Sequence, residues 1–346
     1  MKTKAAVLTK IREDLEIVEI EIPSLKPGQV LIDIAYSGVC HTQLLETRGH
    51  RGEDKFIPHC LGHEGSGIVE ETGPQVKKVK KGDKVILSWM KSSGLDVPNT
   101  VYSWGGKKVS SGAIITFSKK AIVSENRIVK IPADSKISME EAALLGCALP
   151  TGFGAVTNVA KPKKGNSIAV FGSGGIGLFA VCAAKIMGCS PIIAVDINEK
   201  KLETAKFFGA THFINASKED PVQEISKICA LDFAVECSGS TKAMLQCIQS
   251  VRNQGGTVVI VGNAKFGETL CLDPKQFNLG KKILGTWGGD NDPDTDFVKY
   301  IKMVESNKVN LEPFISKKYS LEEVNIALQD LESGSVNRPL IDMGLR

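Results

Sequence analysis

The chain has 346 residues, of which 42% are hydrophobic and 24% are charged, and its formal net charge is +4. This composition is typical of a soluble globular protein that is long enough for two domains. The small and dispersed charge argues against binding to nucleic acid or to a membrane. Nine cysteines, without paired spacing and without a signal peptide, favour a reducing compartment, and we expect the cytoplasm.

The first 150 residues have the pattern of a β-rich domain. Short apolar runs, separated by Pro-Gly, Gly-Pro and Gly-Asp pairs, predict strands at 15–22, 30–34, 67–70 and 84–87. The stretch from Lys91 to Gly112 is polar and rich in glycine and serine. We therefore expect a long surface excursion there.

From about residue 150, apolar strands alternate with helical patterns. The strands are expected at 167–171, 192–195, 233–235 and 257–261. Helices are expected between them at 176–187 and 199–208, and later near 297–305 and 321–331. The alternation predicts βαβ units and a parallel sheet that is covered on both faces.

Cys40, His63 and Cys147 are the most informative residues of the chain, and each follows a glycine by one or two positions. Two thiolates and one imidazole are a ligand set of catalytic zinc, in which the fourth position stays open for water or substrate. Taken singly, each cysteine has an ordinary alternative, because most free cysteines are small buried apolar residues. The spacing alone does not decide between these interpretations.

The segment Gly172-Ser173-Gly174-Gly175-Ile176-Gly177 matches the dinucleotide fingerprint GxGxxG. It follows an expected strand directly and opens an expected helix. Gly172 would permit the tight turn, Gly174 the approach of the pyrophosphate, and Gly177 the close packing of helix on strand. The helix N-terminus would offer its free N–H groups to the phosphates.

Asp196 ends the next expected strand, where a carboxylate binds the adenosine ribose hydroxyls and repels a 2′-phosphate. It therefore favours NAD(H) over NADP(H), although an ordinary helix N-cap is the alternative. Lys201 is either a further ribose contact or a solvated helix lysine.

In combination, these motifs resemble the zinc-dependent medium-chain alcohol dehydrogenases over nearly the whole chain. The likeness rests on six segments, which are 38–42, 61–65, 82–85, 146–147, 172–177 and 261–262. It implies an α/β architecture with a GroES-like β-rich catalytic domain of residues 1–148 and 287–346. It also implies a Rossmann NAD-binding domain with a doubly wound parallel sheet at 149–286, and a homodimer or homotetramer joined through the Rossmann sheets.

The resemblance also implies roles for individual residues. Cys40, His63 and Cys147 would bind the zinc, Glu64 would support the site, and Thr42 would take the proton of the substrate hydroxyl. The residues implied near the cofactor are His41 and Arg338 at the pyrophosphate, with Ile176 and Val261 beside the nicotinamide. Trp89 would line the substrate pocket, with a core tryptophan as the alternative.

Three departures from the family pattern stand out. No cysteine lies between Cys60 and Cys147, so the structural-zinc lobe of many relatives is absent and we expect one zinc ion per chain. Leu45 stands where a histidine often ends the proton relay, so the relay would finish on water or on another group, for which His50 is a candidate. Gln43 replaces an aspartate that orients a zinc-ligand imidazole, so the support of that ligand is altered.

The predicted function is hydride transfer between NAD and an alcohol, primary or secondary and including polyols and sugar derivatives, to give an aldehyde or ketone. Two alternatives stay open. One is a metal-free, NADPH-dependent quinone or enone reductase, which the complete ligand set and Asp196 disfavour. The other is a non-catalytic cofactor-binding protein with a vestigial site, which Leu45 and Gln43 favour.

Overall fold

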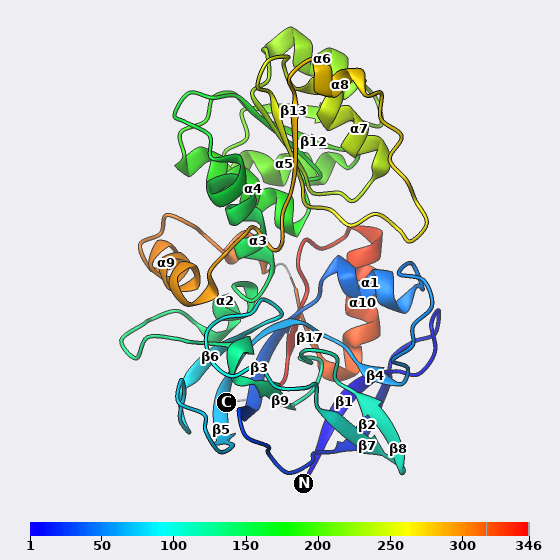
Figure 1. Cartoon of the computed structure of the whole chain (residues 1–346), viewed down its shortest axis with the longest axis vertical. Coiled ribbons are helices and arrows are strands. Elements are labelled where there is room, and N and C mark those ends of the chain that lie inside the picture. Colours follow the sequence, from blue (N-terminus) through cyan, green and yellow to red (C-terminus); the bar gives the residue numbers. More distant parts are fainter. Residues whose placement is uncertain (316, 345–346) are drawn as a thin grey trace. The chain divides into compact units, whose positions relative to one another are not determined.

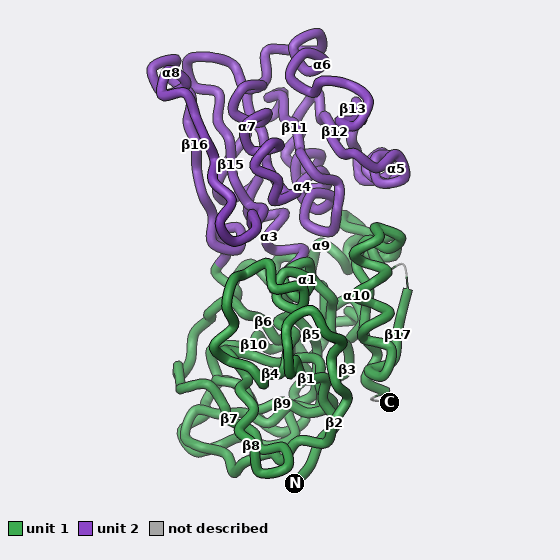
Figure 2. Tube along the Cα trace, turned by 90° about the vertical axis from the view of Figure 1, so that its right-hand side faces the viewer, with its two compact units in different colours: residues 1–147, 292–346 green, residues 148–291 purple. Residues whose placement is uncertain are grey.

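A computed structural model describes residues 1–315 and 317–344 of the chain (Figure 1). The chain divides into two units with separate hydrophobic cores, residues 1–147 with 292–346 and residues 148–291 (Figure 2). The first unit thus ends at 147, where we expected 148, and resumes at 292, where we expected 287.

The first unit contains a closed barrel and a second sheet. The barrel strands follow the order β1 (Lys2–Leu8), β2 (Glu16–Glu21), β7 (Val101–Trp104), β8 (Lys107–Ser110) and β4 (His59–Cys60). The second sheet follows the order β10 (Ile128–Lys130), β6 (Lys84–Ser88), β5 (Glu64–Thr72), β3 (Gln29–Gly38), β18 (Leu340–Asp342) and β17 (Lys318–Ser320), and β9 (Lys120–Ser124) also pairs with β3. The four strands predicted in this part of the chain are confirmed as β2, β3, β5 and β6.

The helices of the first unit come from both of its chain segments. They are α1 (His41–Thr47), α2 (Met139–Leu144), α9 (Pro293–Glu305) and α10 (Val324–Ser333), with 3-10 turns η1 (Glu125–Arg127), η3 (Glu312–Phe314) and η4 (Leu321–Glu323). The helix predicted near 297–305 is confirmed as α9. The helix predicted near 321–331 is η4 followed directly by α10.

The expectation of a surface excursion at 91–112 is wrong for its second half. There, β7 and β8 form an antiparallel hairpin in which Tyr102 faces Val109, and both side chains are buried. The turn is Gly105-Gly106 with φ of 54° and 80°, a conformation that suits a two-residue hairpin turn. This Gly-Gly pair was a usable hairpin signal. Each strand buries only one side chain, so the sequence shows no alternation of apolar and polar residues from which a strand could be recognised.

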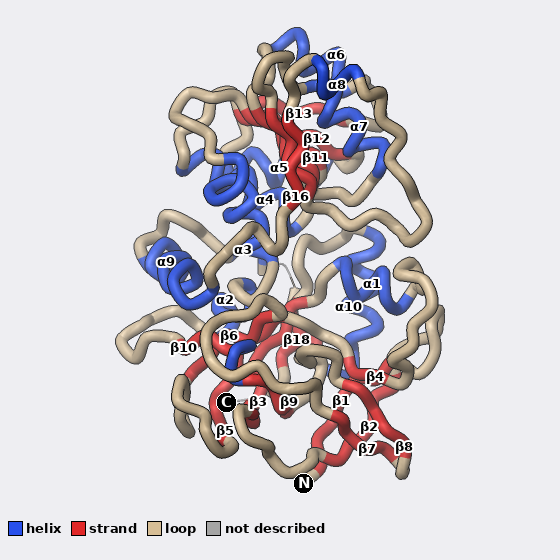
Figure 3. Tube along the Cα trace, viewed as in Figure 1, coloured by secondary structure: helices blue, strands red, loops and turns tan. Residues whose placement is uncertain are grey.

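The second unit is built around a six-stranded parallel sheet (Figure 3). The strand order is β13 (His212–Asn215), β12 (Ile192–Asp196), β11 (Ile168–Phe171), β14 (Phe233–Glu236), β15 (Thr257–Ile260) and β16 (Lys282–Gly285). Chain order reverses between β11 and β14, and this reversal is the switch point at which doubly wound sheets bind ligands. The predicted doubly wound parallel sheet is confirmed.

The helices of the second unit cover both faces of that sheet. They are α3 (Ala148–Gly154), its π-helical continuation η2 (Ala155–Ala160), α4 (Gly175–Ile186), α5 (Glu199–Phe208), α6 (Pro221–Ile228), α7 (Thr241–Ser250) and α8 (Lys275–Asn278). Figure 3 shows α4 and α5 on one face and α6 and α7 on the other. In the described part of the chain, no helix combines the length and the apolar character needed to cross a bilayer.

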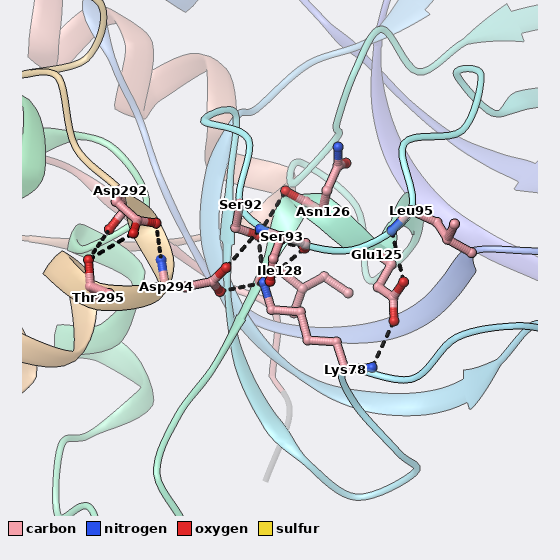
Figure 4. A network of polar contacts seen from close by, with 10 residues as sticks. All are labelled: Lys78, Ser92, Ser93, Leu95, Glu125, Asn126, Ile128, Asp292, Asp294 and Thr295. Atoms are coloured by element: carbon pink, nitrogen blue, oxygen red, sulfur yellow. Dashed lines mark hydrogen bonds and ion pairs between the residues drawn. The ribbon is translucent and has the colours of Figure 1, made fainter.

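The first half of the 91–112 stretch is fastened to the first unit by Glu125 (Figure 4). This side chain is 2% exposed. Its Oε1 accepts the backbone N–H groups of Lys77 and Lys78 at 2.6 and 2.7 Å, and its Oε2 accepts that of Leu95 at 2.9 Å. One carboxylate therefore joins these two loops, which Lys78 Nζ also connects through Ser92 Oγ at 2.6 Å.

A second carboxylate extends this connection to the start of α9. Lys78 Nζ forms an ion pair with Asp294 Oδ1 at 2.5 Å, and the Ser93 N–H donates to Asp294 Oδ2 at 2.7 Å (Figure 4). Burial opposes ionisation of Glu125, yet the N–H groups of Leu95, Lys78 and Lys77 hold its pKa below the ordinary value. The stabilisation by Glu125 is thus present above the ordinary glutamate pKa and is lost as the pH falls through the lowered one.

Replacing Glu125 by glutamine should loosen this segment, because an amide nitrogen cannot accept a backbone N–H. We expect hydrogen exchange roughly 10- to 100-fold faster at Lys77, Lys78 or Leu95, as for buried N–H groups that lose their acceptor. Mass-spectrometric exchange measures this effect, with the exposed Glu203→Gln as control. Unchanged exchange at all three amides would show that Glu125 does not fasten the segment.

Candidate metal and cofactor sites

Three loops of the first unit bring together Cys40, His63 and Cys147. Cys40 is the N-cap residue of α1 and lies two residues after the end of β3, and His63 directly precedes β5. Cys147 lies between α2 and α3, at the end of the unit's first segment. The ligand atoms of the three residues all lie within 4.8 Å of one another. Two sulfurs and one nitrogen at this separation fit a single zinc ion with an open fourth position.

A hydrogen bond couples the ionisation of the two cysteine sulfurs. A hydrogen bond from the Cys147 thiol, aided by Arg338 and His63 and opposed by burial, lowers the pKa of Cys40 well below its ordinary value. The same hydrogen bond and burial raise the pKa of Cys147 well above its ordinary value. The pair thus shares one proton, and cation binding at both sulfurs would displace it.

Glycines let the ligand loops pack closely around Glu64, which is fully buried. A Cβ atom on Gly38 would lie 2.0 Å from Glu64 Oε1, and one on Gly146 would lie 2.8 Å from Glu64 Cβ. Gly38 leads to Cys40 and Gly146 precedes Cys147. The glycines near the predicted ligands therefore have a packing reason that the sequence motif does not reveal.

Arg338 neutralises this buried carboxylate. Its Nε donates to Glu64 Oε1 at 2.7 Å, its Nη2 also approaches that oxygen, and the guanidinium is 3% exposed. Burial opposes its charge, but Glu64 and the two cysteines raise the pKa of Arg338. The sequence placed Arg338 at the cofactor pyrophosphate and missed this ion pair. A cofactor contact from the same side chain stays a prediction.

Gln43 contacts two of the three candidate ligands. Its Oε1 accepts the backbone N–H of Cys40 at 3.0 Å, and its Nε2 lies 2.7 Å from Nδ1 of His63. The bond to Cys40 is the N3-to-N-cap half of a capping box. This departure from the family pattern is therefore in direct contact with the ligands.

The other predicted residues of this unit lie at different distances from the three ligands. Thr42 Oγ1 is 3.8 Å from Cys40 Sγ, and His41 is exposed in the first turn of α1. The backbone N–H of Trp89 donates to the backbone oxygen of His63 at 3.1 Å, and the Trp89 side chain packs against the hydrophobic core of the first unit. Both interpretations of Trp89 thus keep support. Leu45 lies in α1, and His50 lies just after the end of this helix.

The glycine turn of the second unit connects β11 to α4, as the fingerprint predicts. Gly172 has a φ of 93°, and a Cβ atom there would lie 2.8 Å from the Ser238 nitrogen. A Cβ on Gly177 would lie 1.7 Å from the Gly172 oxygen, whereas one on Gly174 would meet nothing within 4 Å. The turn therefore has no room for a side chain at Gly172 or Gly177, but the space beside Gly174 is open. This open space fits a pyrophosphate that lies against the backbone.

Asp196 is the last residue of β12, and its side chain forms a hydrogen bond with the glycine turn. Its Oδ2 accepts the Ser173 N–H at 2.6 Å and its Oδ1 accepts the Asn198 N–H at 2.9 Å. The side chain of Asn198, and not that of Asp196, caps α5. The N-cap alternative for Asp196 is therefore wrong, since Asn198 occupies that position.

The remaining residues predicted to contact the cofactor lie in the second unit and are partly exposed. Ile176 is in the first turn of α4, Lys201 is in the first turn of α5, and Val261 directly follows β15. Ile176 and Val261 follow strands β11 and β15 at the carboxyl edge of the sheet, where doubly wound sheets bind their ligands. Their predicted contacts with a cofactor stay predictions.

Two family models match the chain. Residues 26–133 match the alcohol dehydrogenase GroES-like domain, and residues 175–306 match the zinc-binding dehydrogenase family. An S-(hydroxymethyl)glutathione dehydrogenase of Saccharomyces cerevisiae is 33% identical over 375 residues, which cover 99% of this chain and 96% of the relative. Alcohol dehydrogenase 2 of Oryza sativa subsp. japonica is 32% identical, with coverages of 99% and 98%.

Solved structures show the same likeness over the whole length. The benzyl alcohol dehydrogenase of Acinetobacter calcoaceticus has a TM-score of 0.89 at 30% identity and covers 99% of this chain and 100% of its own. The 2R,3R-butanediol dehydrogenase of Bacillus subtilis has a TM-score of 0.79 at 26% identity, with coverages of 98% and 99%.

Proposed function

This chain belongs to the zinc-dependent medium-chain alcohol dehydrogenase family, and we propose on that basis that it oxidises an alcohol with NAD or runs the reverse reduction. The observation that carries the proposal is the convergence of Cys40, His63 and Cys147 within 4.8 Å. A metal-free reductase has no need of this ligand set. Because no cysteine lies between Cys60 and Cys147, we propose one zinc ion per chain.

The chain's own residues supply binding and proton transfer. Zinc held by Cys40, His63 and Cys147 would supply a Lewis acid for a substrate hydroxyl, and NAD at the glycine turn would supply the hydride acceptor. Thr42, whose Oγ1 lies 3.8 Å from Cys40 Sγ, would accept the hydroxyl proton. Leu45 has no group that could take that proton onward, so His50 or solvent would receive it. The Glu64–Arg338 pair keeps the buried surroundings of the sulfurs close to neutral.

Asp196 and the glycine turn support NAD(H) as the cofactor. Replacing Asp196 by glycine should lower kcat/KM for NAD about tenfold or more and should narrow the preference over NADP. Steady-state kinetics with both cofactors measures this. Because Asp196 also braces Ser173, a melting curve must show that the variant is folded. A folded variant with the parent's cofactor preference would rule out the role of Asp196.

The substrate is proposed as a primary or secondary alcohol, with polyols and sugar derivatives included. The decisive experiment is an alcohol and aldehyde panel with NAD(H), run on protein of known zinc content. Turnover that follows zinc content supports the proposal. Turnover of quinones or enones with NADPH in zinc-free protein would establish the metal-free reductase, and zinc and NAD binding without any turnover would establish a vestigial site.

We further propose a homodimer or homotetramer in the cytoplasm. Support comes from β16, the edge strand of the parallel sheet, which is largely exposed together with Trp287 and Phe277 nearby. An unpaired strand edge with apolar side chains beside it is suited to pairing with a second copy. Sedimentation would measure the assembly directly.

A further inference from the structure

The side chain of Gln43 makes two hydrogen bonds at the proposed zinc site. The residue is 1% exposed, so bulk water has little access to either bond. The Cys40 N–H needs an acceptor, and Gln43 Oε1 provides it at 3.0 Å. The other end of the amide, Nε2, faces His63 Nδ1 at 2.7 Å, so only Nε2 of the imidazole would remain to bind a metal.

This second contact does not suit a zinc-binding imidazole. A neutral histidine that binds a metal through Nε2 carries its proton on Nδ1, and that N–H is normally donated to a carboxylate or carbonyl. The Gln43 atom at this position is an amide nitrogen, which can only donate. The arrangement therefore suits the other tautomer of His63, with the proton on Nε2.

Turning the amide corrects one bond and breaks the other. Oε1 would then accept from His63 Nδ1, but the amide nitrogen would face the Cys40 N–H, so that two donors meet. In either orientation, a glutamine satisfies only one of its two partners once zinc is bound. A carboxylate of the same length has two acceptor oxygens and would satisfy both.

We propose that Gln43 is a positioning residue that weakens zinc retention in this chain. Zinc binding forces a change of the His63 tautomer, and Gln43 must then give up its bond to Cys40 or leave His63 Nδ1 unpaired. The site consequently fills at a higher free zinc concentration than it would with a carboxylate at position 43. The inference rests on the proposed zinc site and adds a determinant of its affinity.

The test is Gln43→Glu, titrated with zinc in metal buffers and read out as bound zinc. We expect half-occupancy at a free zinc concentration about 10- to 100-fold lower than in the parent protein, the size of effect that partners of metal ligands have. Gln43→Met, which removes both bonds, should bind zinc no more tightly than the parent. An equal affinity of Gln43→Glu and the parent would overturn the inference.

The control for added negative charge is Gln29→Glu. Gln29 is also buried, and its Oε1 also accepts a backbone N–H three residues earlier, from Lys26 at 2.9 Å. Its Nε2 donates to Thr100 and not to a candidate ligand. Zinc affinity should therefore stay at the parent's value, and tightening as large as that of Gln43→Glu would assign the effect to charge and overturn the inference.

A spectroscopic readout separates the tautomer argument from stability. In zinc-free protein with ¹⁵N-labelled histidine, at a pH at which the imidazole is neutral, His63 should carry its proton on Nε2 in the parent and on Nδ1 in Gln43→Glu. The Nδ1 tautomer in the zinc-free parent would overturn the inference while leaving the zinc site intact. Failure of every variant and of the parent to bind zinc would instead overturn the proposed site itself.

Discussion

Cys147→Ser should abolish zinc binding and alcohol oxidation together. The serine hydroxyl is a poor replacement for a zinc-bound thiolate, and the site has only three protein ligands to begin with. We expect bound zinc to fall from about one ion per chain to below about a tenth, and turnover to fall roughly 1000-fold or more. Elemental analysis and NADH absorbance measure the two quantities on the same sample.

The matched control for this variant is Cys271→Ser. Cys271 is an exposed free cysteine of the second unit, so its replacement should change neither zinc content nor turnover. The decisive contrary result is full turnover by a Cys147→Ser sample that contains no zinc. It would favour the metal-free reductase over the zinc-dependent alcohol dehydrogenase.

Arg338→Met should destabilise the first unit strongly. The substitution leaves the Glu64 carboxylate buried at 0% exposure without its cation. Breaking one side of a buried ion pair typically costs about 3–5 kcal/mol of unfolding free energy. For a unit of this size, the expected fall in melting temperature is roughly 10 °C, which calorimetry would measure.

The surface pair Arg48–Glu332 offers the control. It is also an arginine–carboxylate pair with two N–H donors, but its side chains are 25% and 48% exposed. Arg48→Met should therefore cost less than about 1 kcal/mol. Adding Glu64→Gln to Arg338→Met should restore part of the lost stability, because the uncompensated charge is removed. Equal melting temperatures for Arg338→Met and Arg48→Met would show that burial does not strengthen the pair.

The predicted elements were most accurate where apolar periodicity is strong. In the second unit, four continuous apolar runs became β11, β12, β14 and β15, and the glycine turn lies where the fingerprint placed it. Buried parallel strands must be apolar on both faces, so their signal is local and clear. The hairpin at 101–110 was missed because each of its strands buries a single side chain.

The candidate zinc ligands could be named from the sequence because thiolates and imidazoles carry a chemical identity of their own. Their surroundings could not. Glu125 fastens loops that are 30 and 48 residues away in the chain, and nothing in its local pattern distinguishes it from a surface glutamate. Gln43 was recognised as a departure, but its simultaneous contact with Cys40 and His63 depends on how α1 packs against the loop before β5.

The amino-acid sequence by itself determined the strand and helix periods, the glycine turn and the identity of the three candidate ligands, because each of these depends on residues that are close in the chain or on chemistry intrinsic to one side chain. Only the tertiary structure decided which groups surround those ligands. Arg338 meets Glu64 across 274 residues, and such a pairing arises from the packing of β3, β5 and the C-terminal segment together, for which no local pattern exists.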